Sequence, residues 1–249
     1  MHFTGPQLIT KLKATAVHLS LSIVVFVYLA YQIYYNWYPE PYFSIDGGWE
    51  GIRLVGAVDL VLGPLITFLI FDLTKSRKKI LSDLLIILLI QFAALAYGVY
   101  TTYAQRPVAI VIFDDFVVPA TMEHYAGTLE SASDLYRYSD ERPPIIYSDF
   151  PTTREGVAEV QRIKMEEKSL EHAQTQLYRP HSELAAALKK RQINALDRLD
   201  KAERRQDFTD WLQQNGKGED EVLIARFSGR YGVAWLIFDL NGVYIDYLQ

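Results

Sequence analysis

The stretch from Leu54 to Asp72 constrains the fold more than any other part of the chain; it reads LVGAVDLVLGPLITFLIFD. A bilayer core of about 30 Å needs about 20 helical residues, and this stretch is long and apolar enough to supply them. It also carries a carboxylate, Asp59, in its first half and a Gly63-Pro64 pair near its middle. A soluble core seldom combines these features, so we predict a membrane span at residues 54–72.

Two further apolar segments flank this one, at about residues 14–35 and 81–103. The first follows Lys11 and Lys13, as a signal peptide would, but it exceeds the usual signal-peptide length and lacks a small-x-small cleavage site. We therefore expect an uncleaved signal anchor, with a cleaved signal peptide as the alternative. Both segments end in tyrosines, which are typical of the membrane interface. A three-span membrane domain over residues 14–105 is predicted.

The basic residues predict how these spans are oriented. The N-terminal segment, residues 1–13, has two lysines and the turn at 74–80 has four basic residues, whereas the loop at 36–53 has one. Short loops rich in Lys and Arg stay in the cytoplasm. The N-terminus is therefore expected in the cytoplasm and the C-terminal domain, residues 106–249, outside. In a Gram-negative cell that domain would lie in the periplasm.

Charge is divided unevenly along the 249 residues. Residues 1–103 hold seven of the 25 basic and six of the 30 acidic side chains, so the remainder is acidic. Nucleic-acid binding depends on basic patches, and this balance argues against it. The chain has no cysteine, which excludes disulfides, thiol catalysis and cysteine metal sites.

Residues 106–249 are expected to form an α+β domain with strands at both ends and helices between them. Apolar and alternating runs predict strands at 108–113, 116–119, 145–148, 222–227, 232–239 and 243–248. Asp114-Asp115, residues 228–230 and Asn241-Gly242 are expected to be turns, and the last pair is a strong hairpin signal. The first strand and the three terminal strands could share one sheet.

Helical periodicity fills the middle of this domain. Stripes of apolar residues predict helices from Thr153 to about Leu177, from Ser182 to Leu199, and from Asp207 to Gln214. Pro180 is expected to stop the first of these helices, and Asn215-Gly216 the last. Residues 123–139 have weaker helical character.

Asp59 admits two interpretations. An ionisable group inside a span is a functional-site hypothesis by default. Alternatively, it lies about 8 Å from the outer end of its span, at about 1.5 Å per residue, where water or a tyrosine hydroxyl reaches it. In both cases the side chain is expected to face the helix bundle, because exposing it to lipid would cost about 3 kcal/mol.

Four other residues join Asp59 as candidates for helix packing or partner binding. Gly56 and Gly63 would let a neighbouring helix approach closely. Pro64 removes a backbone donor and is expected to kink its helix. Gln91, in the third span, is available for a hydrogen bond between helices.

No catalytic constellation is visible. The histidines, at positions 2, 18, 124, 172 and 181, do not form a zinc pattern. Nucleophile-elbow, P-loop and dinucleotide glycine motifs are absent. Asp114-Asp115 favours a turn over a sugar-nucleotide metal motif, because the two acids are adjacent rather than spaced. We predict no enzymatic activity, no metal and no cofactor.

Residues 14–113 resemble the type IV pilin accessory proteins of the TfpX/TfpZ group. The resemblance rests on Trp37-Tyr38-Pro39, on Val58 to Pro64 with its Asp59, on Gln91 to Tyr100, and on Arg106-Pro107. Their order, spacing and topology coincide with the group, whereas no motif aligns beyond residue 113. The resemblance implies a multi-pass inner-membrane protein that helps a cognate type IV pilin accumulate or assemble, as a chaperone. Its implied partners are that pilin and the pilus-assembly machinery, with no catalytic residues.

Other function classes stay open from the sequence alone. A membrane-anchored periplasmic ligand sensor is one, although the inner segments 1–13 and 74–80 are too short for a kinase or DNA-binding output. A pilin-modification partner would require an acid or base cluster that the sequence does not reveal. A transporter would need more than three spans with one buried acid, unless the protein oligomerises.

Overall fold

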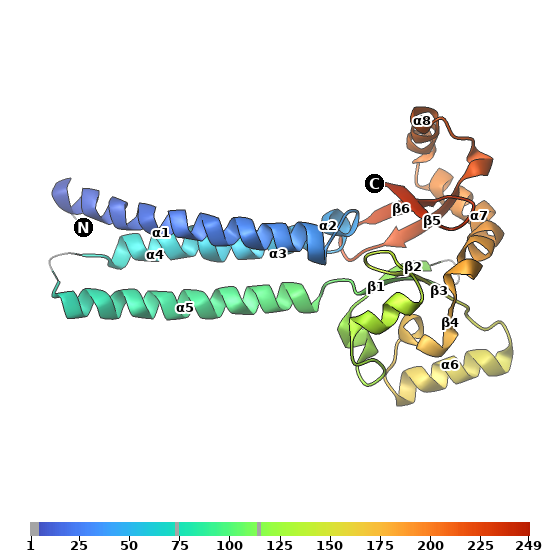
Figure 1. Cartoon of the computed structure of the whole chain (residues 1–249), viewed down its shortest axis with the longest axis horizontal. Helices are drawn as coiled ribbons and strands as arrows, with labels where there is room; N and C mark the ends of the chain where they lie inside the picture. Colours follow the sequence, from blue (N-terminus) through green and yellow to red (C-terminus); the bar gives the residue numbers. More distant parts are fainter. Residues whose placement is uncertain (1–4, 73–74, 114–115) are drawn as a thin grey trace. The chain divides into compact units, whose positions relative to one another are not determined.

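Three long apolar helices occupy the N-terminal part of the chain (Figure 1). In the computed structural model, which describes residues 5–72, 75–113 and 116–249, they cover Gly5–Trp37, Gly48–Ile70 and Arg77–Ala104. The first consists of α1 (Gly5–Tyr31) and a π-helical end, η1 (Gln32–Trp37); the third is α5 (Arg77–Ala104). All three are long and apolar enough to cross a membrane, which confirms the prediction of three such helices.

The second helix changes geometry in its middle. It comprises α3 (Gly48–Gly56), the π-helical η2 (Ala57–Leu62) and α4 (Gly63–Ile70). It begins before the expected Leu54, directly after Gly47, whose φ of 116° turns the chain into the helix. Pro64 has no N–H for the carbonyl one turn earlier, and the wide π turn lies directly before it. Asp59 therefore sits on an irregular turn, not on a regular α-helical one.

The chain folds into two units. One contains the apolar helices, up to Pro39 and from Gly47 to Ala104; the other contains residues 40–46 and 105–249. Residues 40–46, which we call the inserted segment, thus belong to the second unit although they lie between two apolar helices in sequence. The sequence predicts only a loop at these residues, and no local pattern indicates that they join the second unit.

A seven-stranded mixed sheet forms the second unit, in the order β4-β3-β1-β2-β5-β6-β7. β1 pairs antiparallel with β2 and parallel with β3, and β2 joins β5 in parallel, so the expected single sheet is present. The strands are β1 (Ala109–Phe113), β2 (Phe116–Ala120), β3 (Ile145–Ser148), β4 (Tyr178–Arg179), β5 (Leu223–Ser228), β6 (Val233–Phe238) and β7 (Tyr244–Leu248). The six predicted strands are confirmed within a residue or two, and the short β4 was missed. The predicted Asp114-Asp115 turn lies outside the described residues.

The helices of this unit agree with the sequence analysis in two cases of three. α7 (Leu184–Lys201) and α8 (Arg205–Asn215) were predicted, and α8 ends at Gly216 in the left-handed region, with φ 62°. α6 (Arg154–Glu166) is much shorter than predicted. Its continuation is broken at Lys168, whose φ is 56°, and the chain then forms only short turns, η5 (Glu171–Ala173) and η6 (Thr175–Leu177), before β4.

The residues after α6 that continue the apolar stripe are buried, but not as one face of a helix. Ala173 is fully buried in a cluster with Val111 and Tyr178, and the buried Gln174 donates to the carbonyl of Val160 at 3.0 Å. Residues 123–139 likewise form 3₁₀ turns, η3 (Met122–Tyr125) and η4 (Ala132–Arg137), instead of an α-helix. Tertiary packing has overridden helical periodicity in both places.

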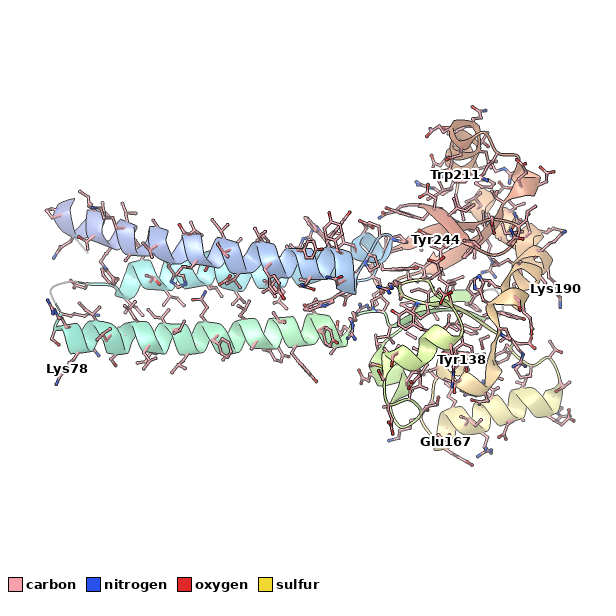
Figure 2. The ribbon with its side chains drawn as sticks, viewed as in Figure 1. Lys78, Tyr138, Glu167, Lys190, Trp211 and Tyr244 are labelled. Carbon is pink, nitrogen blue, oxygen red and sulfur yellow. The ribbon has the colours of Figure 1, made fainter. Side chains whose placement is uncertain are left out.

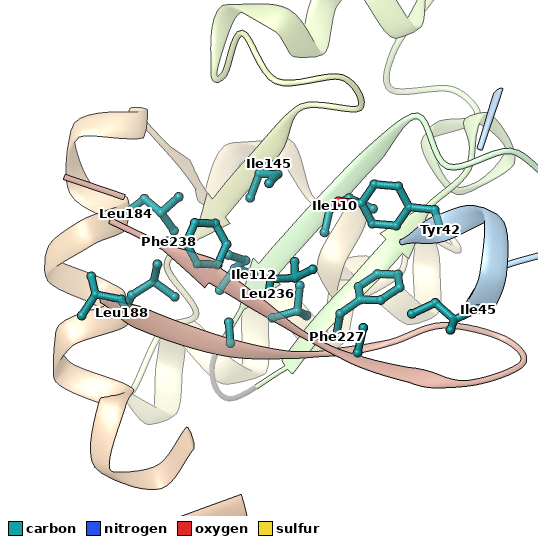
Figure 3. Packing of buried hydrophobic residues seen from close by; sticks show 14 residues of the cluster. Tyr42, Ile45, Ile110, Ile112, Ile145, Leu184, Leu188, Phe227, Leu236 and Phe238 are labelled. Carbon is teal, nitrogen blue, oxygen red and sulfur yellow. The ribbon is translucent and has the colours of Figure 1, made fainter. Parts of the chain in front are cut away.

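The core of the second unit lies on both faces of the sheet. Leu184 and Leu188 of α7 pack with Phe227, Leu236 and Phe238 (Figure 3). A second cluster groups Tyr125, Leu135 and Tyr178 with Val111. α8 completes a third cluster with Trp235 and Ile237. Its Trp211, labelled in Figure 2, donates the indole N–H to Asp246 Oδ2 of β7 at 2.8 Å.

The inserted segment is part of the first of these clusters. Its one-turn helix α2 (Tyr42–Ile45) buries Tyr42 against Phe227, with ring centroids 5.2 Å apart (Figure 3). Ile45 is 1% exposed, and its carbonyl accepts the backbone N–H of Tyr231 at 2.9 Å. A side chain at Gly229 would collide with that carbonyl, so a glycine is needed in the β5–β6 turn.

An ion pair between a buried carboxylate and a partly exposed arginine fixes the end of this segment. Asp46 is completely buried, and its Oδ1 accepts the backbone N–H of Arg230 at 3.1 Å and its Nε at 3.2 Å. The same guanidinium also donates to the carbonyls of Asp46 and Gln105. Burial raises the pKa of Asp46, and Arg230 opposes that rise. The pair closes the inserted segment onto the turn between β5 and β6.

Candidate functional site

Asp59 joins the three apolar helices at one carboxylate oxygen. Its Oδ1 accepts a hydrogen bond from Ser22 Oγ of α1 at 3.0 Å and from Gln91 Nε2 of α5 at 2.9 Å. The side chain is 4% exposed, so it faces the bundle. Hydrogen bonds between apolar helices hold them together where lipid offers no competing partner.

Two acceptors at this junction have no hydrogen-bond partner within the described part of the chain. They are Asp59 Oδ2 and Gln91 Oε1, and both atoms are buried. Buried polar atoms are nearly always paired, so an unpaired one calls for an explanation. The junction therefore has two acceptor atoms left for a further hydrogen-bond donor.

The remaining candidate residues lie close to this junction or one turn away. An added Cβ at Gly63 would collide with the amide of Gln91, so Gly63 lets α5 approach. Pro64 is buried beside it. Gly56 instead faces Phe26 of α1, whose ring would lie 3.2 Å from an added Cβ. The structure thus brings Asp59, Gly63 and Gln91 together and places Gly56 at a separate contact.

Three polar residues of α1 that were not among the predicted packing candidates lie on the same face of the bundle. His18 Nδ1 is 2.6 Å from Thr67 Oγ1, and Lys11 Nζ donates to the carbonyls of Phe68 and Leu69, at 3.1 Å each. Lys11 thereby satisfies the carbonyls at the C-terminal end of α4. His18 follows Lys11 by seven residues and Ser22 follows His18 by four, a spacing that places all three on one face of α1.

A groove of about 620 Å³ opens between α1 and α5, with the second helix as its floor. Asp59, Thr67 and Phe71 contribute the floor. The α1 stripe, which forms one wall, is Ala14, Val17, His18, Leu21, Ser22 and Val25. The α5 stripe, which forms the other, is Leu84, Ile87, Leu88, Gln91, Phe92 and Leu95. The groove is mostly apolar, with the Asp59 junction inside it.

The second unit contains one close histidine pair. His172 Nε2 lies 3.1 Å from His124 Nδ1, and the rings meet edge to face. Burial, followed by the neighbouring His124, lowers the pKa of His172 to about 4, and burial also lowers the pKa of His124. Among the residues that the structure describes, no group of three His, Asp or Glu side chains is placed to hold a metal.

A more polar cavity of about 530 Å³ lies near the C-terminal hairpin, also in the second unit. Its lining includes Glu141, His181 and Arg137. Burial raises the pKa of Glu141, and His181 opposes that rise. No contact between these side chains forms an acid–base pair with defined geometry, so the groove between α1 and α5 is the better candidate site.

Comparison with known proteins places the chain in a family. The family model for fimbrial assembly protein FimB matches residues 6–47. The fimbrial assembly protein of Dichelobacter nodosus serogroups C1 and C2 is 38% identical over 99 residues, which are 40% of this chain and 76% of that relative. The chain belongs to the fimbrial assembly protein FimB family.

Two other relatives are much longer than the region that matches this chain. The D. nodosus fimbrial assembly proteins of serogroups E1 and I are 39% and 38% identical over 99 residues, which span 40% of this chain but only 38% of either relative. The FimB family model covers α1, η1 and the inserted segment, so it reaches into both units. No solved structure matches the chain.

Proposed function

We propose that this chain is an inner-membrane accessory protein that helps a type IV pilin of its own cell accumulate or assemble. The observation that carries the proposal is the identity of 38–39% to fimbrial assembly proteins of D. nodosus. The narrower likeness to the TfpX/TfpZ group belongs to the same proposal, because the motifs around Asp59 carry it.

The proposed arrangement in the membrane follows from length and charge. Spans at about 14–35, 54–72 and 81–103 would cross the inner membrane, with residues 1–13 in the cytoplasm and residues 106–249 in the periplasm. Lys11 and the basic residues around Lys78, which Figure 2 labels, support this orientation. Short basic segments stay in the cytoplasm.

The work proposed for this protein is binding, not catalysis. A pilin that waits in the membrane presents an apolar helix and a globular head outside. The apolar helix of the pilin could pack against apolar helices that carry small and polar residues. In this chain these residues are Gly56, Gly63, Pro64, Asp59 and Gln91. The unit that contains the sheet would contact the globular head of the pilin. Such contacts would shield the pilin until the pilus machinery takes it.

Deletion of the gene and co-purification of the protein test this function. We expect the deletion to lower the amount of pilin and of surface pili, with both restored by the intact gene in trans. The protein, tagged at its C-terminus and extracted in mild detergent, should bring down the pilin. Unchanged pilin and piliation in the deletion strain, together with no pilus component in the extract, would refute the proposal.

A further inference from the structure

We propose that the groove between α1 and α5 binds one membrane-spanning helix of the pilin. This helix carries a side chain that donates a hydrogen bond at the depth of Asp59. The inference rests on the proposed function, in which the client is a pilin. It adds which surface of the bundle is occupied and what chemistry the occupant brings.

The pattern of the two walls fits a helix as the occupant. In the α1 stripe and in the α5 stripe, successive residues are separated by three, one, three, one and three positions. This is the spacing of a helix face that packs along another helix. Each stripe is about 16 Å long at about 1.5 Å per residue. Two parallel stripes of equal length therefore form a surface on which a further helix packs.

Several apolar side chains of these walls are exposed, and nothing in the described part of the chain buries them. Leu21 is 65% exposed and Leu88 63%, although both lie in the groove. Any apolar chain, including a lipid tail, would satisfy them equally. The walls therefore give the shape of the occupant but do not distinguish a protein helix from lipid.

The polar atoms in the floor of the groove distinguish a protein helix from lipid. Asp59 Oδ2 and Gln91 Oε1 are buried acceptors without a partner in the described ranges. A lipid tail has no donor to offer them, whereas a helix that carries Ser, Thr, Asn, Gln or Lys has one. An unsatisfied acceptor in an apolar setting is costly, so a donor at this depth would fix the register of the bound helix.

Photocrosslinking from matched positions tests the inference in the native membrane of the pilin-producing cell. A photoreactive amino acid at Leu21 or at Leu88 faces the groove. The same residue at Val24, which is 68% exposed, or at Leu89, 58% exposed, lies on the same helices outside the groove. We expect pilin adducts from Leu21 and Leu88 and at least about tenfold fewer from Val24 and Leu89.

A pair of blocking variants gives a second readout. Leu21→Trp places an indole in the groove, whereas Val24→Trp places the same side chain outside it, and neither position is buried. We expect the first to reduce co-purified pilin about tenfold, which corresponds to about 1.4 kcal/mol of binding, and the second to leave it unchanged. Equal yields of the two purified variants from the membrane show that both fold.

The outcomes separate this inference from the proposed function. Pilin adducts from Val24 and Leu89 but not from the groove would overturn the groove and leave the function standing. Groove adducts only to lipid or to a second copy of this chain would also overturn it. If no position captures pilin and the deletion leaves pilin unchanged, the function itself fails. Mass spectrometry of the Leu21 and Leu88 adducts must place a donor side chain within one turn; a wholly apolar segment would refute the role of Asp59.

Discussion

At the scale of single residues, Asp59 is where a small chemical change should have the clearest effect. Asp59→Asn keeps an oxygen that can accept from Ser22 and Gln91, whereas Asp59→Leu keeps the volume and loses both hydrogen bonds. We expect the asparagine variant to retain most pilin accumulation and the leucine variant to lose it. Each lost bond between apolar helices costs about 0.6–2 kcal/mol.

Immunoblots of pilin in membranes would measure this difference, with thermal unfolding of the purified protein in detergent alongside. Val61→Leu, at an exposed position on the same helix, is the control. Wild-type behaviour of both Asp59 variants would show that the carboxylate is dispensable.

The histidine pair predicts how stability depends on pH. Because the pKa of His172 is lowered to about 4 from an ordinary value of 6.5, the unfolded chain takes up a proton on acidification before the folded one does. Stability should be complete above about pH 6.5 and should decline as the pH falls towards 4. One such proton changes the unfolding free energy by at most about 1.4 kcal/mol per pH unit.

Thermal unfolding at pH 7.5, 6 and 5 would show this decline. The double variant His124→Gln/His172→Gln should lose less stability over that range than the wild type does. Parallel curves for the two proteins would contradict the prediction.

Some residues of the candidate site were open to prediction and others were not. Asp59 was, because a carboxylate in an apolar run has few explanations, and so was Gln91. Ser22 was not, because a serine in a helix can bond its own backbone, and nothing local indicates a partner 37 positions away. The histidine pair, 48 positions apart, was hidden for the same reason.

At the scale of elements, the contacts of the inserted segment lead to a prediction. A substitution near the C-terminus should release residues 40–46, which follow the first helix in sequence. Arg230→Met would leave the buried Asp46 carboxylate without its cation. Because the Arg230 side chain is 33% exposed, we expect a loss of about 2–3 kcal/mol, below the roughly 3–5 kcal/mol of fully buried pairs. Burial already raises the pKa of Asp46, so without Arg230 the acid would protonate more readily and the loss should shrink at low pH.

Denaturant unfolding of the purified protein, followed by tryptophan fluorescence, measures this loss. Arg154→Met, at an exposed arginine at the start of α6, controls for the change in charge and length. The double variant Arg230→Met/Asp46→Asn should recover part of the stability. If Arg230→Met alone behaves like Arg154→Met, the ion pair does not hold the segment.

The elements themselves were predictable where local sequence and packing agree. Strands were visible because β-branched runs such as 108–113 end at strong turn signals, and Asn241-Gly242 fixed the last hairpin. The helix predicted from Thr153 to Leu177 failed because Lys168 turns the chain and Ala173 packs against the sheet. The position of the inserted segment depends on residues more than 180 positions away, which no local pattern contains.

At the scale of the whole molecule, the proposed topology can be tested on a chain that has no cysteine of its own. A membrane-impermeant maleimide added to cells with a permeabilised outer membrane should label Asn241→Cys, in the last hairpin. It should not label Ser76→Cys, in the basic turn, until the inner membrane is disrupted. Labelling of Ser76→Cys but not Asn241→Cys in intact cells would reverse the proposed orientation.

The ion pair between Asp46 and Arg230 also determines how late in synthesis the inserted segment can be buried. The two residues are 184 positions apart, so at a translation rate of about 5–20 residues per second the ribosome needs roughly ten to forty seconds to reach the second after the first. Throughout that interval Tyr42 and Ile45 have no core to enter, because β5 and β6 do not yet exist. A nascent chain that stalls before the β5–β6 turn cannot close its sheet unit, and quality-control proteases would find these side chains uncovered.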